Sequence, residues 1–424
     1  MKQVSTMQRI PALILMVFAG TASAAGFQLQ NQSGSGNGNA FAGAAAAAED
    51  ASTVFFNPAG MANLSRGHSI SLSGTLLNRS VDFRDKGSTT TSGFPLASGD
   101  GGDAGTLSLI PAGYWVYGIS PQWSVGLGVG PTFGNKTEYK KDFIGRNAGY
   151  SFEMKQVNIN PSIAYKVNEK VSLGAGINFA RNDSEFKQGV PNSLTNFLNV
   201  EGDDWAVGYN LGAMFQLSPS TRVGLSYRSR LNFELEGKEK FLAPAGSLVN
   251  QDVKAKLKTP ANFSMAVSQK LSDKWEMLGD ITWTDWSVVD NVYVNSEGSG
   301  ARLQKLSYNF KDSWRVGLGA NYQYNTAWKL RFGVAHDNSP VTRSVDRTMT
   351  LPDSDRTWLS FGAKYTLSPA ASLDFGYSHI FFADARTSRA VTTGYPGAET
   401  VRQTIRGDVE TSVDILSVQY NRTF

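Results

Sequence analysis

Long stretches in which apolar and polar residues alternate are the feature that most constrains the fold of this chain. In residues 171–179 every odd position is apolar and every even position is small or polar, and residues 314–323 and 416–421 alternate in the same way. Strict alternation gives a strand one face toward an apolar medium and one face toward a polar medium. A soluble β-sandwich can show the same local pattern, so the arrangement of the segments along the chain must distinguish the two.

Short turns and long polar connections join the alternating segments in a regular order. The short turns lie at residues 121–122, 168–169, 218–219, 272–273, 325–326 and 368–369, and the long connections lie near 84–104, 135–148, 188–203, 238–252, 294–302, 337–354 and 384–405. This order predicts an all-β fold of fourteen antiparallel strands, with both chain ends on the side of the short turns. It is typical of a transmembrane β-barrel in a bacterial outer membrane, where closure leaves no unpaired edge in lipid.

Aromatic residues support this interpretation. Trp123, Trp275 and Trp328 each follow a short turn, where interfacial aromatic side chains are expected.

Residues 1–24 are predicted to be a secretory signal peptide. Lys2 and Arg9 provide a positive start, residues 10–18 a short apolar run, and Ala22-Ser23-Ala24 a small-residue cleavage site. The run is shorter than the roughly 20 residues that a spanning helix needs. The alternative, a buried helix of a cytosolic protein, fits poorly because the chain turns at once to Gly, Ser, Asn and Gln after Ala24.

Residues 25–65 differ from the rest of the chain, because they are rich in Gly, Ala, Asn and Ser and show little alternation. A fourteen-stranded barrel has an interior that side chains alone need not fill. We therefore expect residues 25–65 to form a hatch, or plug, inside the lumen, and residues 66–424 to form the barrel. A disordered tail would carry more charge and fewer apolar residues such as Phe41, Phe55 and Phe56.

Charge, cysteine and histidine content argue against several functions. The chain has 40 Lys and Arg residues against 36 Asp and Glu residues, and the signal peptide removes two of the cations, so nothing favours nucleic-acid binding. There are no cysteines, three histidines and no Gly-x-Ser-x-Gly elbow. We therefore expect no enzyme, no cofactor and no structural metal. Asp100-Gly101-Gly102-Asp103 leaves two alternatives, a calcium site or a flexible turn.

Several motifs resemble those of the FadL-type family, the outer-membrane transporters of long-chain fatty acids and related hydrophobic compounds. They are Ala25-Gly26-Phe27-Gln28-Leu29, Glu49-Asp50-Ala51, Asn57-Pro58-Ala59, Phe310-Lys311-Asp312 with Trp314-Arg315, and the segments 337–341 and 351–360. The resemblance covers the whole chain after residue 24. Departures from the family pattern are the alanine run at 44–48, a shorter loop at 188–203, and Asn338 where the best-known members have an acidic residue.

The resemblance implies a fourteen-stranded barrel closed by the hatch, with an outer groove, an inner pocket and sideways release at a kinked third strand. Phe27 would lie at the inner pocket, and Asn57, Pro58 and Ala59 would contact the kink. The third strand is expected to begin at Trp123, with Gly134 as its kink residue, since glycine permits a bulge.

Lys305 is the cation that the resemblance places near the inner pocket, where it could pair with a carboxylate headgroup. The alternative is an ordinary lysine at the rim or in the lumen.

An outer groove is suggested by apolar residues in the long connections. Leu194, Phe197 and Leu198 stand at helical spacing, and Leu242 and Leu248 of the next connection could form the facing wall. Exposed apolar side chains are expected to cover each other or a ligand, so the alternative is a small loop core without a ligand.

The resulting hypothesis is a passive, hatch-gated channel for long-chain fatty acids or similar molecules in a Gram-negative outer membrane. The same architecture could instead serve aromatic or alkane hydrocarbons, which would depend little on Lys305. A general porin would conduct ions, and the hatch argues against it. We expect a monomer surrounded by outer-membrane lipids, whose last strand, ending at Phe424, is read by the barrel-assembly machinery.

Overall fold

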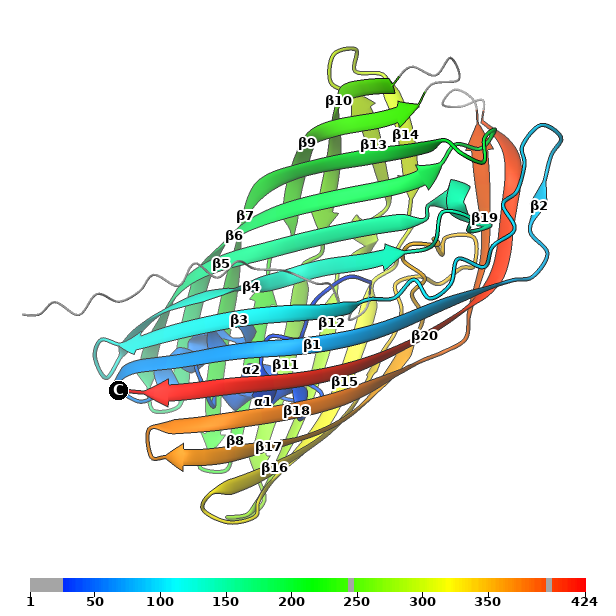
Figure 1. Ribbon diagram of the computed structural model, residues 1–424. Helices are drawn as coiled ribbons and strands as arrows, with labels where there is room; N and C mark the ends of the chain where they lie inside the picture. The colour runs from blue at the N-terminus through cyan, green and yellow to red at the C-terminus, as the bar shows by residue number, and fades with distance from the viewer. Residues whose placement is uncertain (1–25, 243–247, 394–398) are drawn as a thin grey trace, which may run out of the picture.

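The alternating segments form the wall of an antiparallel β-barrel (Figure 1). The computed structural model describes residues 26–242, 248–393 and 399–424. The expected signal peptide, residues 1–24, and the side chain of Leu242 lie outside what it describes. No helix among the described residues is long and apolar enough to cross a membrane.

Helices are few and short. They are α1 (Gly34–Asn37), α2 (Ala44–Ala47), α3 (Thr53–Phe56), and the 3-10 turns η1 (Pro58–Asn63), η2 (Arg146–Ala148) and η3 (Trp286–Val288). The strands are β1 (Gly67–Asp85), β2 (Thr89–Thr90), β3 (Leu107–Gly118), β4 (Trp123–Glu138), β5 (Ser151–Asn168), β6 (Val171–Gly189), β7 (Phe197–Ser218), β8 (Thr221–Arg228), β9 (Leu231–Leu242), β10 (Leu248–Thr259), β11 (Asn262–Lys270), β12 (Trp275–Thr284), β13 (Asn291–Ser296), β14 (Arg302–Ser307), β15 (Ser313–Gln323), β16 (Trp328–Asp337), β17 (Arg356–Ser368), β18 (Ala371–Phe382), β19 (Ala385–Thr393) and β20 (Thr400–Thr423).

The barrel has fourteen strands, as the sequence predicts. The side strand β2 lies in the first outer loop, and five wall strands are each interrupted once: β8 with β9, β10 with β11, β12 with β13, β14 with β15, and β18 with β19. β20 pairs with β1 from Ser69↔Thr423 to Asp85↔Gly407 and closes the sheet. Closure satisfies the backbone groups that would otherwise face lipid.

The outward face carries an apolar belt with aromatic residues at its lower edge. Exposed residues of this face include Leu72, Leu76, Leu416 and Val418, and β1 and β20 place them side by side. Next to three of the short turns a tryptophan packs on a tyrosine of the neighbouring strand. The pairs are Trp123–Tyr165, Trp275–Tyr322 and Trp328–Tyr365, with ring centroids 4.6, 4.7 and 4.6 Å apart. This repeated pair is the arrangement expected of an interfacial girdle.

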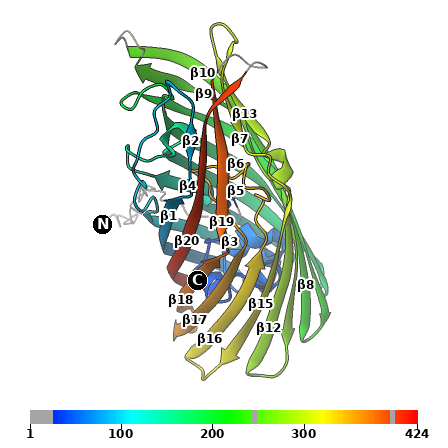
Figure 2. The ribbon, with the colours of Figure 1, turned by 90° about the vertical axis from the view of Figure 1, so that its right-hand side faces the viewer.

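The N-terminal segment, residues 26–65, lies within the barrel near the end that carries the short turns (Figures 1 and 2). α1 contacts β17, β18 and β20, α2 contacts β8, β11 and β12, and η1 contacts β4 to β7. Contacts on all sides of the wall show that the segment occupies the interior.

Inward-facing glycines of the wall allow this close approach. A Cβ atom at Gly333 of β16 would lie 2.1 Å from the carbonyl carbon of Asn39, and one at Gly224 of β8 would lie 1.9 Å from the carbonyl oxygen of Ala45. Because both neighbours are backbone atoms, the N-terminal segment would have to move to admit a side chain.

We therefore expect Gly333→Ala to weaken the seating of the N-terminal segment by about 1–3 kcal/mol, the usual cost of overpacking, and to leave the wall intact. Hydrogen–deuterium exchange of residues 34–48 should increase. Gly74→Ala in β1 is the matched control, because nothing lies within 4 Å of a Cβ there. Equal exchange in the two variants would contradict the tight contact.

Candidate functional site in the barrel lumen

The third strand of the barrel, β4, separates from β3 halfway along its length. The two strands pair only from Gly113↔Val129 to Gly118↔Ser124. Against β5, the register of β4 shifts between Pro131 and Phe133. Proline has no N–H to donate to a ladder. The irregularity therefore falls just before Gly134, the residue expected to produce it.

Residues 27–32 of the N-terminal segment lie along the edge of β4 that β3 leaves unpaired. Leu29 N donates to Thr132 O at 2.9 Å, Gly134 N donates to Phe27 O at 2.8 Å, and Gln28 forms an antiparallel bridge with Phe133. The N-terminus thus replaces β3 as the partner of the outer half of β4.

The side chain of Gln32 connects the separated strands. Its amide nitrogen donates to the carbonyl of Pro131 in β4, and its oxygen accepts a hydrogen bond of 2.9 Å from the hydroxyl of Tyr114 in β3. The separation of β3 and β4 is therefore held by residues that come from the N-terminal segment.

The Asn57-Pro58-Ala59 motif packs elsewhere than expected. Asn57 Nδ2 donates to Ala45 O at 2.7 Å and to Ala213 O of β7 at 3.1 Å, while its Oδ1 accepts from Ala59 N at 3.1 Å. η1 contacts the wall mainly at β5, β6 and β7. The expectation that this motif contacts the kink is therefore wrong, because residues 27–32 already hold that edge. The motif instead fixes the other side of the N-terminal segment.

Phe27, the residue that the resemblance places at an inner pocket, lies inside an aromatic cluster. It is buried and packs edge-on against Trp286 at 4.9 Å and Phe133 at 6.0 Å between ring centroids. Phe310 contacts Trp286 on its far side at 5.9 Å. The N-terminus, the kinked strand and two later segments therefore meet in one apolar cluster.

An apolar cavity adjoins this cluster on the outer side. Its lining includes Phe152, Phe186, Leu235, Leu257 and Tyr308, which also belong to the cluster. The inner faces of β5, β6, β9 and β10 thus provide a continuous apolar surface from the outer loops to Phe27.

Lys305 does not lie in this pocket. It is exposed on β14, whereas its neighbour Leu306 lines the apolar cavity. Successive side chains of a strand point to opposite faces, so Lys305 points out of the barrel. The alternative of a rim lysine describes it better.

The expected outer groove is replaced by a continuous sheet. Phe197 and Leu198 begin β7 rather than a helix, and Leu198 pairs with Phe241 of β9. Phe197 is covered by Arg146, whose guanidinium lies 4.2 Å from the ring centroid. Leu194 and Leu248 are exposed at the hairpin ends. The apolar residues of the two connections therefore lie on neighbouring strands or hairpin ends of one sheet and do not form facing walls. The reason is that β7 and β9 extend into segments that were expected to be loops.

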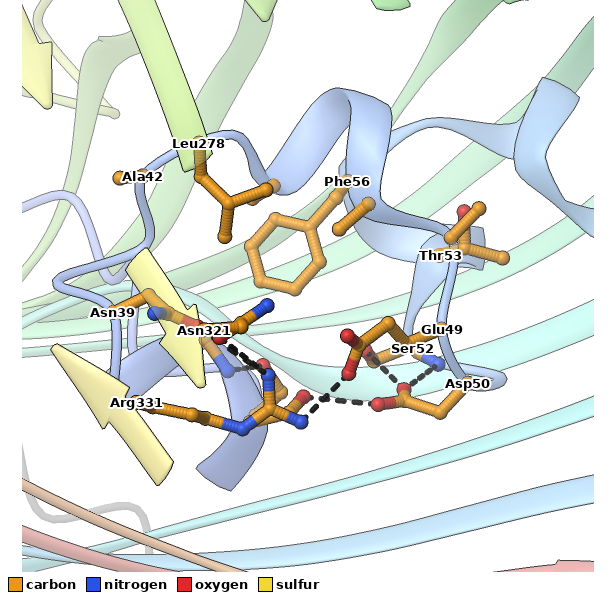
Figure 3. A pocket seen from close by; sticks show the side chains of 16 residues that line it. Asn39, Ala42, Glu49, Asp50, Ser52, Thr53, Phe56, Leu278, Asn321 and Arg331 are labelled. Carbon is orange, nitrogen blue, oxygen red and sulfur yellow. Dashed lines mark hydrogen bonds and ion pairs between the residues drawn. The ribbon is translucent and has the colours of Figure 1, made fainter. Parts of the chain in front are cut away.

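Buried ion pairs hold the N-terminal segment to the wall (Figure 3). Arg331 of β16 contacts Glu49 at 2.6 Å and Asp374 of β18 at 2.8 Å, and Lys329 contacts Glu49 at 3.0 Å. Burial alone would raise the pKa of the Glu49 carboxyl, but Arg331 and Lys329 hold that pKa well below its usual range. Figure 3 shows Glu49 and Arg331 pointing toward each other in a cavity of about 410 Å³ that Phe56 also lines.

A second set of buried charges lies above the first. Arg315 of β15 contacts Asp280 at 2.9 Å and Asp337 at 3.3 Å, and it donates to the carbonyl of Ala40. Near the start of the described chain, Asp353 accepts from Gly26 N at 3.3 Å. Burial raises the pKa of the Asp353 carboxyl above its ordinary value. Sequence analysis missed these anchors. In the sequence, these anchors are indicated only by an arginine at a position where an alternating strand faces the lumen.

Among the described residues no group of three or more His, Cys, Asp or Glu side chains is arranged so that it could hold a metal ion. Asp103 accepts from Val81 N and Gly105 N at 2.8 Å each, so it caps the backbone of the first outer loop. His379 contacts Asp414 at 2.8 Å on the outward face.

Comparisons with known proteins agree with this architecture. Residues 15–424 match the family model described as outer membrane protein transport protein (OMPP1/FadL/TodX). The chain is 28% identical to a long-chain fatty acid transport protein of Escherichia coli O6:H1 over 87% of this chain and 90% of that one. It is 27% identical to outer membrane protein P1 of Haemophilus influenzae, over 98% and 99% of the two chains.

Solved structures show the same fold. A Pseudomonas aeruginosa FadL homologue superposes with a TM-score of 0.86 at 22% identity, covering 94% of this chain and all of that one. The Pseudomonas putida toluene transporter TodX superposes with a TM-score of 0.70 at 16% identity, covering 93% and 99%. The chain therefore belongs to the OMPP1/FadL/TodX family, whose members are outer-membrane transport channels for hydrophobic compounds rather than enzymes.

Proposed function

We propose that this protein carries long-chain fatty acids, or molecules of similar shape and polarity, passively across the outer membrane, with residues 26–65 as the hatch. One observation carries the proposal. The apolar cluster around Phe27 lies against the stretch of β4 that has left β3, and residues of the hatch cover that stretch.

The route that this geometry supports has three stages. A ligand enters the apolar cavity below the outer loops, passes to the cluster around Phe27, and leaves sideways between β3 and β4 into the membrane. Each buried methylene contributes about 0.8 kcal/mol, so an acyl chain is held without covalent chemistry. Transport then needs no energy source if later metabolism removes the ligand.

Two related proteins suggest different ligands. The relative from Escherichia coli is a long-chain fatty acid transport protein, and TodX is a toluene transporter. The relative named for long-chain fatty acids is 28% identical to this chain and TodX is 16% identical, so we favour the fatty acid, with aromatic or alkane hydrocarbons as the second candidate.

Uptake of labelled oleate and labelled toluene by a transporter-deficient Gram-negative host tests the proposal. Cells that express the wild-type chain should accumulate oleate several-fold faster than cells with an empty vector. Because transport is passive, this difference should not depend on an ion gradient. Equal uptake by both strains for both compounds would show that the proposed function is wrong.

A reversible cross-link tests the sideways exit. Gln28→Cys with Phe133→Cys places two thiols at an antiparallel bridge, in a pair whose flanking hydrogen bonds run from Leu29 N and Gly134 N. Such non-hydrogen-bonded pairs have Cα atoms about 4.5 Å apart, which suits a disulfide. The native chain has no cysteine to interfere. We expect oxidation to reduce oleate uptake at least about fivefold, and reduction to restore it.

Thr75→Cys with Ser417→Cys is the control for that experiment. These residues pair in β1 and β20, with hydroxyl oxygens 2.8 Å apart, and the two strands stay joined throughout the proposed cycle. Its uptake should not respond to oxidation. If oxidation reduced uptake equally in both cysteine pairs, or reduced it in neither pair, release beside β4 would be excluded.

The Glu49 anchor should respond to pH. Because the folded-state pKa of Glu49 is lowered, its contribution to hatch stability is complete above the unfolded value of about 4.3 and is lost as the pH falls toward the folded value. Glu49→Gln should loosen residues 26–65 at pH 7, by about 3 kcal/mol if the buried pair behaves typically. Limited proteolysis of the hatch measures this. Glu169→Gln, whose side chain is 90% exposed, should change nothing.

A further inference from the structure

The lining of the lumen changes from apolar to polar at one height. Four neighbouring wall strands are interrupted there, and their inner halves end at residues that pair in series: Arg228 with Asn262, Asn262 with Thr284, and Thr284 with Ser313. These residues therefore form one level across β8, β11, β12 and β15.

Directly above this level the inward side chains are apolar, and farther out Glu239 of β9 is buried with Gln251 and Gln304. Leu231, Phe233 and Leu235 of β9 are buried in the cluster that contains Phe27, and Leu257 of β10 joins them. Leu306 of β14 packs against the same cluster. An acyl chain would meet hydrocarbon from β9, β10 and β14 here.

Below the level the inward side chains are polar, and they line a cavity of about 580 Å³. Its wall carries hydroxyl, amide and charged groups, namely Gln28, Gln30, Ser226, Arg228, Asn262, Ser264, Asp280, Thr282 and Arg315. Phe41, Phe55 and Phe56 of the hatch also line it. The lumen thus has an apolar outer part and a polar inner part that meet at Arg228.

The two arginines of this cavity differ in their counterions. Arg315 contacts the carboxylates of Asp280 and Asp337. Arg228 donates to Asn178 Oδ1 and, at 2.9 Å, to the carbonyl of Phe55, and its guanidinium lies 4.7 Å from the Phe55 ring centroid. Among the described residues no carboxylate forms an ion pair with it. A buried charge without a counterion is costly.

Further hydrogen-bond donors stand at the same height. Thr259 pairs with Leu231 at the end of β10, and Trp286 follows the end of β12. Thr259 Oγ1 and Trp286 Nε1 are both buried without a hydrogen-bond partner among the described residues. Buried polar groups normally have a hydrogen-bond partner, so these two donors are available to an acceptor atom of a ligand.

We propose that Arg228 is the counter-cation for the headgroup of an anionic amphiphile, a long-chain carboxylate, bound with its headgroup in the polar cavity and its chain in the apolar cluster. This inference rests on the proposed function and selects between its two ligand classes. A neutral hydrocarbon would leave Arg228 without a counterion, whereas a carboxylate accepts directly from a guanidinium. Lys305 cannot take this role, because its side chain is exposed outside the lumen.

Arg228→Gln and Arg222→Gln form a matched pair for the test. Arg222 lies on the same strand and also donates to a hatch carbonyl, that of Ala47, but it does not line the polar cavity. Competition with a fluorescent fatty acid on the purified full chain would measure the Kd of oleate and of oleyl alcohol. We expect Arg228→Gln to weaken oleate binding about tenfold to a hundredfold, since hydrogen bonds to charged groups contribute about 1.5–3 kcal/mol. Oleyl alcohol should change less than about threefold.

Arg228→Lys should recover most of the oleate affinity, and Arg222→Gln should affect both ligands by less than about twofold. The wild type gives a measurement that needs no variant: it should prefer oleate to methyl oleate by the same factor that Arg228→Gln costs. Equal loss for oleate and oleyl alcohol, or no preference for oleate over its methyl ester, would overturn the assignment of Arg228. If the wild type binds none of these compounds, the proposed function itself is wrong.

Discussion

The requirement that every backbone N–H and C=O in the membrane find a partner determines the rest of this structure. The wall meets it by closing β20 onto β1. One gap in the ladder lies in the outer half of β4, which β3 does not pair. There the N-terminus supplies the missing backbone partners through Phe27 and Leu29. The segment that occupies the lumen therefore also completes the wall, so moving it would expose unpaired backbone groups at β4.

The N-terminal segment is held by two kinds of contact with different consequences. Glycines of the wall, such as Gly333, admit its backbone at van der Waals distance. Buried ion pairs, such as Glu49 with Arg331, anchor it by charge. Ion pairs in a low-dielectric interior gain little net stability over apolar packing, but removing one partner is costly. Apolar contacts add to both, since Phe41 packs with Trp358 of the wall and Met61 packs with Tyr114.

Much of the fold could be predicted from the sequence, because alternation and turn spacing are local signals. The six short turns and the fourteen strands follow from them, and Trp123 and Trp328 could be placed beside their turns. The site was harder, since it depends on register between distant strands. The pairing of Arg331 with Asp374 joins β16 to β18, two strands apart in the sheet. Lys305 was assigned to the pocket by its motif, yet a shift of one residue along β14 reverses the face. Phe197 and Leu198 were read at helical spacing although β7 already includes them.

The polar cavity and the hatch meet at Arg228, which contributes to both. Its guanidinium lines the cavity and donates to the carbonyl of Phe55 in α3. A guanidinium offers five N–H donors in one plane, so a second acceptor changes the geometry available to the first. Suppose that a bound headgroup strengthens or weakens the Arg228–Phe55 hydrogen bond by some free energy. By thermodynamic linkage, the contact between α3 and Arg228 then changes the binding free energy of that headgroup by the same amount. If Arg228 binds a ligand headgroup as proposed, the charge of the ligand and the contact between α3 and the wall are coupled through this one side chain.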